Sequence, residues 1–167
     1  GCKIAICEQM ETPKEAKKRG YKSIVNRDVV RVISPGTLLE DTFLEQRKNN
    51  ILACLFFFEK SWSVCWIDIS TNLFQISSTV ESEVLSLVEQ LDPSEILIHE
   101  IDHKKIALNG LLPQEAITIM KKKPSGKKDI IESLDDLFSL KDLSNFNSCQ
   151  LGAISTIIKY LGASKNL

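Results

Sequence analysis

The eight residues from Ile51 to Phe58 form an unbroken apolar run, and no other segment constrains the fold as strongly. Aromatic residues are frequent in the run and polar residues flank it, which favours a β-strand. Successive side chains of a strand point to opposite faces, so both faces of this strand are apolar. Such a strand is typically covered on both sides. The run is also far shorter than the roughly 20 apolar residues of a membrane-spanning helix.

The segments after this run alternate in a recognisable order. Antiparallel strands are predicted over 62–70 and 73–77, followed by an amphipathic helix with a capping box that begins at Ser78. The later elements are expected to be a strand over 95–99, a short helix over 103–108, a strand over 116–120, and helices around 130–138 and 151–161. This order predicts an α/β fold, a ribonuclease H-like mixed sheet with helices on its faces.

The first residues read as a partial α/β N-terminal segment. Strands are expected over 2–8 and 28–33, with a short helix over 10–19 that begins after Thr12. A turn containing Pro and Gly, Ser34 to Thr37, closes the segment. Because the chain opens on a strand without an initiator Met, we expect a domain whose beginning lies outside it.

The charge is unevenly distributed. The composition, 43% apolar and 26% charged, is that of a packed globular domain, and the net charge of -1 argues against a chain that coats nucleic acid. Residues 1–31 nevertheless hold eight Lys or Arg and four acidic residues, whereas residues 32–167 hold 13 and 18. The basic N-terminal cluster is either a solvated surface or a contact with a phosphate backbone.

The five cysteines are odd in number and widely spaced, which favours reduced thiols in the cytoplasm. If Lys60-Ser61 is a two-residue hairpin loop, Cys54 faces Ile67 and Cys65 faces Phe56. The two cysteines are then not directly paired, and no disulfide is expected.

Two carboxylates suggest an alternative function, a metal-dependent nuclease. Ribonuclease H-like nucleases hold two divalent ions between carboxylates at strand ends, and Asp68 and Glu100 lie at such positions, with Glu81 and Glu83 nearby. Asp68 also precedes the turn residues 70–72, where a short carboxylate usually caps the turn.

Other binding motifs are incomplete. His99 and His103 have the spacing of a zinc pair, but His99 ends a predicted strand and Cys2 and Cys7 are remote, so no metal site is expected. The segment 125–128 resembles part of a phosphate loop, but the residues that this motif requires at its two ends are absent. The lysines around Pro124 are interpreted as a solvated connector, with a binding patch as the alternative: Lys121, Lys122, Lys123, Lys127 and Lys128.

Several segments together resemble the MutS family of bacterial DNA mismatch-repair proteins. They are the stretch Lys3 to Lys17, with its Cys-Glu-Gln-Met-Glu-Thr-Pro core, and the stretch Arg27 to Asp41, with Ile-Ser-Pro-Gly-Thr. The asparagine pair before Ile51 and the Trp-Ile-Asp-Ile-Ser-Thr run from Trp66 also resemble the family. The resemblance spans essentially the whole chain.

This resemblance implies a domain organisation. Residues 1–37 would be the last part of the mismatch-recognition domain, residues 38–144 the connector domain, and residues 145–167 a helix leading into the core and lever region. The wedge motif that enters a mismatch would lie upstream, and the ATPase with its phosphate loop downstream. The fragment is therefore expected to be non-catalytic and to hold no cofactor of its own, although the full-length family uses ATP and Mg²⁺.

The resemblance also implies partners. The connector would link mismatch recognition to the lever and ATPase domains and offer a surface to MutL, in a cytoplasmic protein that is homodimeric at full length. Contacts with the DNA backbone are expected at five basic residues: Arg27, Arg31, Lys17, Lys18 and Arg19.

Overall fold

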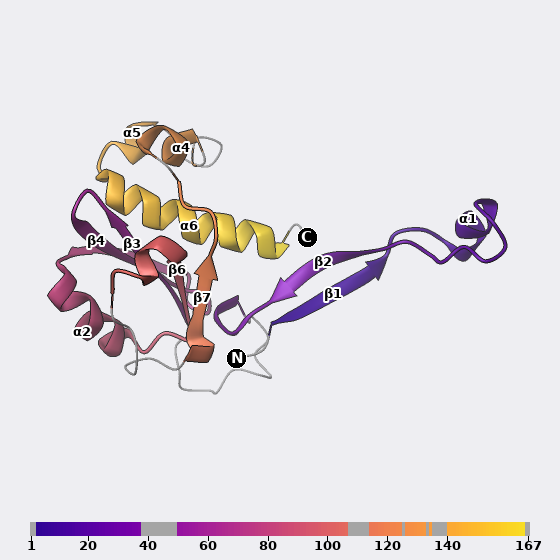
Figure 1. The fold of residues 1–167 in the computed structure, drawn as a ribbon, viewed down its shortest axis with the longest axis horizontal. Helices are drawn as coiled ribbons and strands as arrows, with labels where there is room; N and C mark the ends of the chain where they lie inside the picture. Colours follow the sequence, from indigo (N-terminus) through magenta and orange to yellow (C-terminus); the bar gives the residue numbers. More distant parts are fainter. Residues whose placement is uncertain are drawn as a thin grey trace.

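The computed structural model describes residues 3–37, 50–106, 114–124, 126–132, 134 and 140–165. An N-terminal hairpin projects away from an α/β body that contains the rest of the described chain (Figure 1). No helix in these ranges is long and apolar enough to cross a membrane.

The hairpin consists of β1 (Ile4–Gln9) and β2 (Arg27–Ile33), which pair antiparallel. Between them α1 (Pro13–Lys18) lies at the far tip (Figure 1). Thr12 caps α1 through its side chain, and Glu15 returns a bond to the Thr12 backbone N–H. The predicted cap at Thr12 is confirmed, and the helix is shorter at both ends than the predicted range.

The body is built on one five-stranded sheet in the order β5-β4-β3-β6-β7. Its strands are β3 (Ile51–Phe58), β4 (Ser61–Asp68), β5 (Leu73–Thr79), β6 (Glu95–His99) and β7 (Ile117–Met120). Strands β3, β4 and β5 form an antiparallel meander, whereas β6 and β7 run parallel to β3. The predicted α/β mixed sheet is confirmed.

Helices cover both faces of β3, as the apolar run predicts. Leu52, Cys54 and Phe56 are buried beneath α6 (Ser148–Lys165). Ala53 and Leu55 are buried on the other face, in a cluster with residues of α2 (Glu81–Leu91). The smaller elements are α3 (Glu100–His103), α4 (Lys127–Glu132), α5 (Leu140–Leu143), and the 3₁₀ turns η1 (Pro35–Thr37) and η2 (Gln114–Ala116).

The predicted loop of the β3-β4 hairpin is displaced by one residue, so every predicted cross-strand partner is wrong by two residues. Its loop is Glu59-Lys60, both with positive φ (47° and 67°), and Phe58 pairs with Ser61. Cys54 consequently lies directly opposite Cys65, and both thiols are free. Two successive residues with positive φ are characteristic of the tight hairpin turn that matches strand twist, but this turn normally carries Asn or Gly.

Two helix starts also differ from the prediction. Strand β5 extends to Thr79, so Ser78 lies in the strand and cannot cap α2, whose N-cap is Val80. In place of the short helix predicted over 103–108, α3 begins three residues earlier, directly after β6, and ends at His103; residues 107 and 108 lie outside the described residues. The helix predicted around 130–138 is represented by α4, and Leu137 and Phe138 lie outside the described residues.

Helix α6 is integrated into the body and packs against β3 and β4 (Figure 1). Leu151, Ala153 and Ile157 on this helix are buried in the same core as Phe56. The expectation that residues 145–167 lead into the core and lever region stays a prediction, and α6 packs on the sheet in this chain. The domain boundaries themselves remain predictions.

The close approach of α6 to β3 depends on Gly152, because a Cβ there would overlap the ring of Phe56. Gly152→Ala should therefore lower the free energy of unfolding by about 1–3 kcal/mol, the usual cost of overpacking. Urea denaturation of the 167-residue chain measures this change.

Gly162→Ala in the same helix is the matched control. A Cβ at Gly162 meets nothing within 4 Å, so this substitution should raise stability by about 0.5–1 kcal/mol. Equal effects of the two substitutions would contradict the packing described for α6.

Candidate functional site

A buried carboxylate connects the hairpin to the body. Glu95 begins β6 and is 1% exposed. Its Oε2 accepts hydrogen bonds from the Ser34 hydroxyl (2.5 Å) and the Gly36 backbone N–H (3.2 Å). Both donors lie where the chain leaves β2 and enters η1. Oε2 of Glu95 thus accepts both of these hydrogen bonds from the N-terminal segment.

The other oxygen of Glu95 binds elements of the body. Oε1 accepts from the hydroxyl of Thr118 in β7 and from that of Tyr160 in α6, each at 2.6 Å. The Lys3 ammonium lies 3.6 Å from the same oxygen. We call Glu95 with Ser34, Gly36, Thr118 and Tyr160 the Glu95 junction. It joins the hairpin, the sheet and α6 through a single side chain.

The surroundings of Glu95 favour its charged form. Burial acts to raise the pKa of its carboxyl, but the hydrogen bonds from Ser34, Thr118 and Tyr160 outweigh burial and lower that pKa. Burial, together with the hydrogen bond to Glu95, raises the pKa of the Tyr160 hydroxyl, so Tyr160 remains a donor. The junction is therefore an ionised carboxylate surrounded by donors.

Gly36 is required where η1 meets β6. A Cβ at Gly36 would lie 2.8 Å from the Cβ of Glu95 and 3.0 Å from the side chain of Leu52. The Cβ of Glu95 is fixed to the backbone, and the terminal methyl of Leu52 is fully buried in the core, so neither neighbour can easily move away. The absence of a side chain at Gly36 lets its backbone N–H reach the carboxylate.

The lowered pKa of Glu95 makes stability depend on pH. Ionised Glu95 stabilises the fold at neutral pH, and this contribution is lost as pH falls through the folded-state pKa. Glu95→Gln should cost about 2–3 kcal/mol near neutral pH, because the fixed Gly36 and rotatable hydroxyl donors lose a charged acceptor. The difference from the wild type should shrink as pH falls below the ordinary range of a glutamate pKa. Urea denaturation at several pH values measures it.

Glu100→Gln is the control for this experiment. Glu100 is exposed and paired with Lys104 at 3.0 Å, an arrangement that contributes little. Glu100→Gln should leave stability nearly unchanged at any pH. A pH-independent cost for Glu95→Gln would show that its charge does not stabilise the junction.

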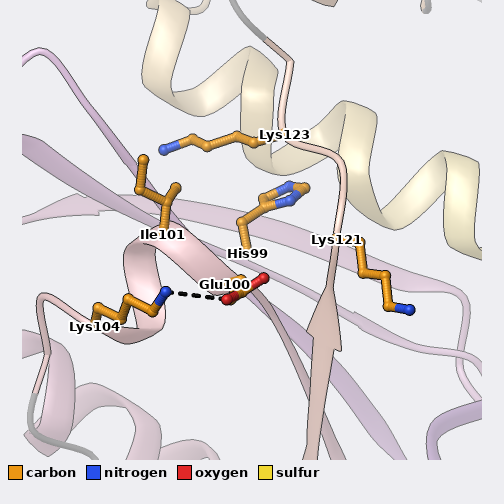
Figure 2. A pocket seen from close by; sticks show the side chains of 6 residues that line it. All are labelled: His99, Glu100, Ile101, Lys104, Lys121 and Lys123. Atoms are coloured by element: carbon orange, nitrogen blue, oxygen red, sulfur yellow. Dashed lines mark hydrogen bonds and ion pairs between the residues drawn. The ribbon is translucent and has the colours of Figure 1, made fainter.

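The opposite end of the parallel strands is rich in lysine. Five lysines line two cavities there, and we call them the lysine-rich edge: Lys104, Lys121, Lys122, Lys123 and Lys159. Figure 2 shows the first of these cavities, with His99 between the segment carrying Lys121 and Lys123 and the helix carrying Glu100 and Lys104. This is the end of an open α/β sheet at which ligands commonly bind.

One lysine of this edge is structural. Lys123 lies 2.6 Å from Oδ1 of the fully buried Asp102 and also donates to the Phe57 carbonyl. Asp102 in turn accepts from the Phe57 backbone N–H at 3.2 Å. The interpretation of the Pro124 lysines as a solvated connector is wrong for Lys123. Its position three residues after β7 carries no signal of burial in the sequence, because its partner Asp102 is 21 residues away.

Removal of Lys123 should leave Asp102 buried without a counter-charge. Lys123→Met should therefore destabilise the chain by about 3–5 kcal/mol, the usual cost of breaking a buried pair. Thermal or urea unfolding measures the change. Lys122→Met is the matched control: Lys122 is exposed, and its substitution should leave stability nearly unchanged. Equal losses would contradict the pairing.

The two carboxylates of the nuclease hypothesis lie at opposite ends of the sheet. Asp68 pairs with Ile51 at the start of β3, whereas the β3-β6 register carries Glu100 to the level of Phe57. Six residues of strand separate these levels, about 20 Å at roughly 3.3 Å per residue. Asp68 caps the turn through Ser70, as the turn residues suggested. Asp68 and Glu100 cannot share a metal ion in this fold.

The histidine pair does not form a zinc site. His99 is buried beneath α6, where its Nε2 lies 3.1 Å from the Thr156 hydroxyl, and His103 follows in α3. Within the described part of the chain, no three His, Cys, Asp or Glu side chains are grouped to hold a metal ion.

The five basic residues predicted to contact DNA all lie on the hairpin. Lys17 and Lys18 occupy the last turn of α1 and are exposed. Arg19 forms a two-nitrogen pair with Glu11, which also accepts from the Asn26 N–H. The remaining two residues, Arg27 and Arg31, lie on β2, exposed and half-buried respectively.

The architecture defines a class, an α/β domain with a ribonuclease H-like mixed sheet, joined to an N-terminal hairpin. The family model of MutS domain II matches residues 50–166, and that of MutS domain I matches residues 1–42. The chain belongs to the MutS family.

Curated relatives agree with this assignment. The chain is 33% identical over 170 residues to a DNA mismatch repair protein MutS of Ehrlichia ruminantium, covering 99% of this chain and 21% of the relative. It is 34% identical to MutS of Bartonella tribocorum, over 96% of this chain and 19% of the relative. A 100-residue stretch is 47% identical to MutS of Ehrlichia chaffeensis, over 60% of this chain and 12% of the relative. The chain thus spans about a fifth or less of these relatives.

Proposed function

We propose that this chain is the connecting part of a MutS protein, a non-catalytic element between the mismatch-recognition domain and the lever and ATPase domains. The Glu95 junction is the observation that carries the proposal. It anchors Ser34 and Gly36, which follow the hairpin, to the sheet and to α6. A displacement of the hairpin would therefore be transmitted to the body through these hydrogen bonds and not through a flexible linker.

The remaining activities belong, in this proposal, to the whole protein. The ATPase site with its Mg²⁺ lies in other domains, the full-length protein is a homodimer, and the connector surface contacts a MutL-type partner. Residues 1–37 complete the mismatch-recognition domain, residues 38–144 form the connector, and residues 145–167 continue toward the core and lever region. The matches of MutS domain I to residues 1–42 and of MutS domain II to residues 50–166 support the division between the first two parts.

The hairpin is the proposed DNA-proximal part. Lys17 and Lys18 have the exposure that backbone contacts require, and Arg27 lies along the same projection. Arg31 and Arg19 are weaker members of the set, because Arg31 is half-buried and Arg19 already pairs with Glu11. Such contacts bind phosphate and carry no sequence information.

DNA binding by the 167-residue chain should consequently be weak, salt-sensitive and equal for matched and mismatched duplexes. Lys17→Ala combined with Lys18→Ala should reduce the slope of log affinity against log salt by about 2, since each phosphate contact contributes roughly 1. Fluorescence anisotropy with a homoduplex and a single-mismatch duplex measures both quantities.

Lys127→Ala combined with Lys128→Ala is the control, because it removes the same charge from α4 in the body. This variant should leave the salt slope unchanged. Clear preference for the mismatched duplex, or ATP hydrolysis by the chain alone, would overturn the proposal of a non-catalytic connecting part.

A further inference from the structure

Two buried polar side chains of β6 contact helix α6. Glu95 begins β6 and His99 ends it, and residues four apart in a strand share a face, here the face that α6 covers. The Tyr160 hydroxyl donates to Glu95 Oε1 at 2.6 Å, and we call this contact the junction rung. The Thr156 hydroxyl lies 3.1 Å from His99 Nε2, and we call this contact the histidine rung. Strand and helix are thus joined by a polar contact at each end of β6.

The geometry of the two rungs fixes the position of α6 along β6. Four residues span about 13 Å in a strand but only about 6 Å in a helix. The long side chain of Tyr160 makes up part of this difference, whereas the short side chain of Thr156 reaches only a ring directly beside it. Both contacts therefore form together at one position of the helix, and a shift of α6 along the strand disturbs both.

Close packing fills the space between the rungs. Leu97 lies between them on β6 and is buried in the same core as Ile157 of α6. Beside the histidine rung, the rings of Phe56 and His99 meet edge-on, with 5.6 Å between their centroids. Gly152 of α6 lies so close to Phe56 that a Cβ would overlap the ring. Because such a core has little free space, a movement at one rung is carried to the other.

The rungs belong to two separate regions of the molecule. The junction rung is part of the Glu95 junction, which also receives the Ser34 hydroxyl and the Gly36 N–H from the end of the hairpin. The histidine rung borders the lysine-rich edge, because His99 contributes to the walls of both cavities there (Figure 2). Strand β6 and helix α6 together therefore connect the attachment point of the hairpin with the opposite end of the parallel strands.

We propose that β6 and α6 form a relay in which the two rungs strengthen each other, so that a change at the Glu95 junction alters the contacts of His99 at the lysine-rich edge. The inference rests on the proposed connecting function and names the route by which the hairpin influences the far end of the sheet. Loss of a donor at the junction lets α6 shift along β6, and this shift weakens the contact between Thr156 and His99. Such a coupling is reciprocal, because it is a free energy shared by two sites.

A double-mutant cycle on the 167-residue chain tests the coupling. Ser34→Ala acts on Glu95, and Thr156→Val acts on His99. Each should raise the equilibrium constant of unfolding about tenfold, because a buried polar group loses a partner. Glu95 and His99 lie about 13 Å apart along β6, and effects at such separations are usually independent to within about twofold.

The relay predicts that the double variant is at least about threefold less destabilised than the product of the two single effects, since the first substitution has already weakened the second contact. A smaller departure from that product would overturn the proposal. Ser34→Ala combined with Val88→Ala is the control, because Val88 is buried against the opposite face of the sheet. These two effects should multiply, and an equal departure in the control pair would also overturn the relay.

Histidine ring carbon–proton NMR spectra follow the relay without relying on stability. The chain contains two histidines, His99 and His103, and only His99 belongs to a rung. Ser34→Ala should shift the His99 signals and leave those of His103 in place. The same substitution in a Tyr160→Phe background should no longer shift them, because the junction rung is already absent. Unmoved His99 signals in Ser34→Ala, or an equal shift in both backgrounds, would overturn the relay.

Failure of the relay and failure of the proposed function are distinguishable. The proposed function requires that the Glu95 junction holds the hairpin to the body, which the tumbling of the two parts reports. The relay requires in addition that the state of the junction reaches His99. Independent effects of the substitutions, with the hairpin and the body still tumbling together, would remove the relay alone.

Discussion

The buried, ionised carboxylate of Glu95 is the interaction on which the arrangement of this chain depends. A charge at 1% exposure is stable only where donors replace the lost water, and four donors from separate elements do so. Oε2 accepts from Ser34 and Gly36, and Oε1 accepts from Thr118 and Tyr160 with Lys3 nearby, so a displacement of the hairpin or of α6 removes donors from a buried charge. The junction therefore gives the chain one preferred arrangement of its two parts.

The two ends of the parallel strands carry different groups of side chains. The amino end of β6 holds the junction, and the carboxyl end holds the lysine-rich edge with its buried Asp102–Lys123 pair. Between them, Gly152 brings α6 close to β3, so the same helix presents Tyr160 to the junction and Thr156 to His99. A packed layer thus links the hairpin to the far edge of the sheet, as the proposed connecting role requires.

The layered fold could be predicted because its signals are local. The apolar run Ile51 to Phe58 indicated a strand covered on both faces, and this is confirmed. The junction could not be predicted, since Ser34, Thr118 and Tyr160 lie 61, 23 and 65 residues from Glu95 in sequence. The pairing of Cys54 with Cys65 was not predicted because it depends on the position of a two-residue turn, and this turn lacks the Asn or Gly that usually marks it.

Backbone ¹⁵N relaxation tests the central claim directly, because it measures the tumbling of the hairpin and of the body separately. The Glu95 junction predicts one shared rotational correlation time for β1-β2 and for the sheet in the wild-type chain. It also predicts a shorter time for the hairpin alone in Ser34→Ala, which removes a donor to Oε2 and leaves the core intact. Independent tumbling of the hairpin in the wild-type chain would contradict the account.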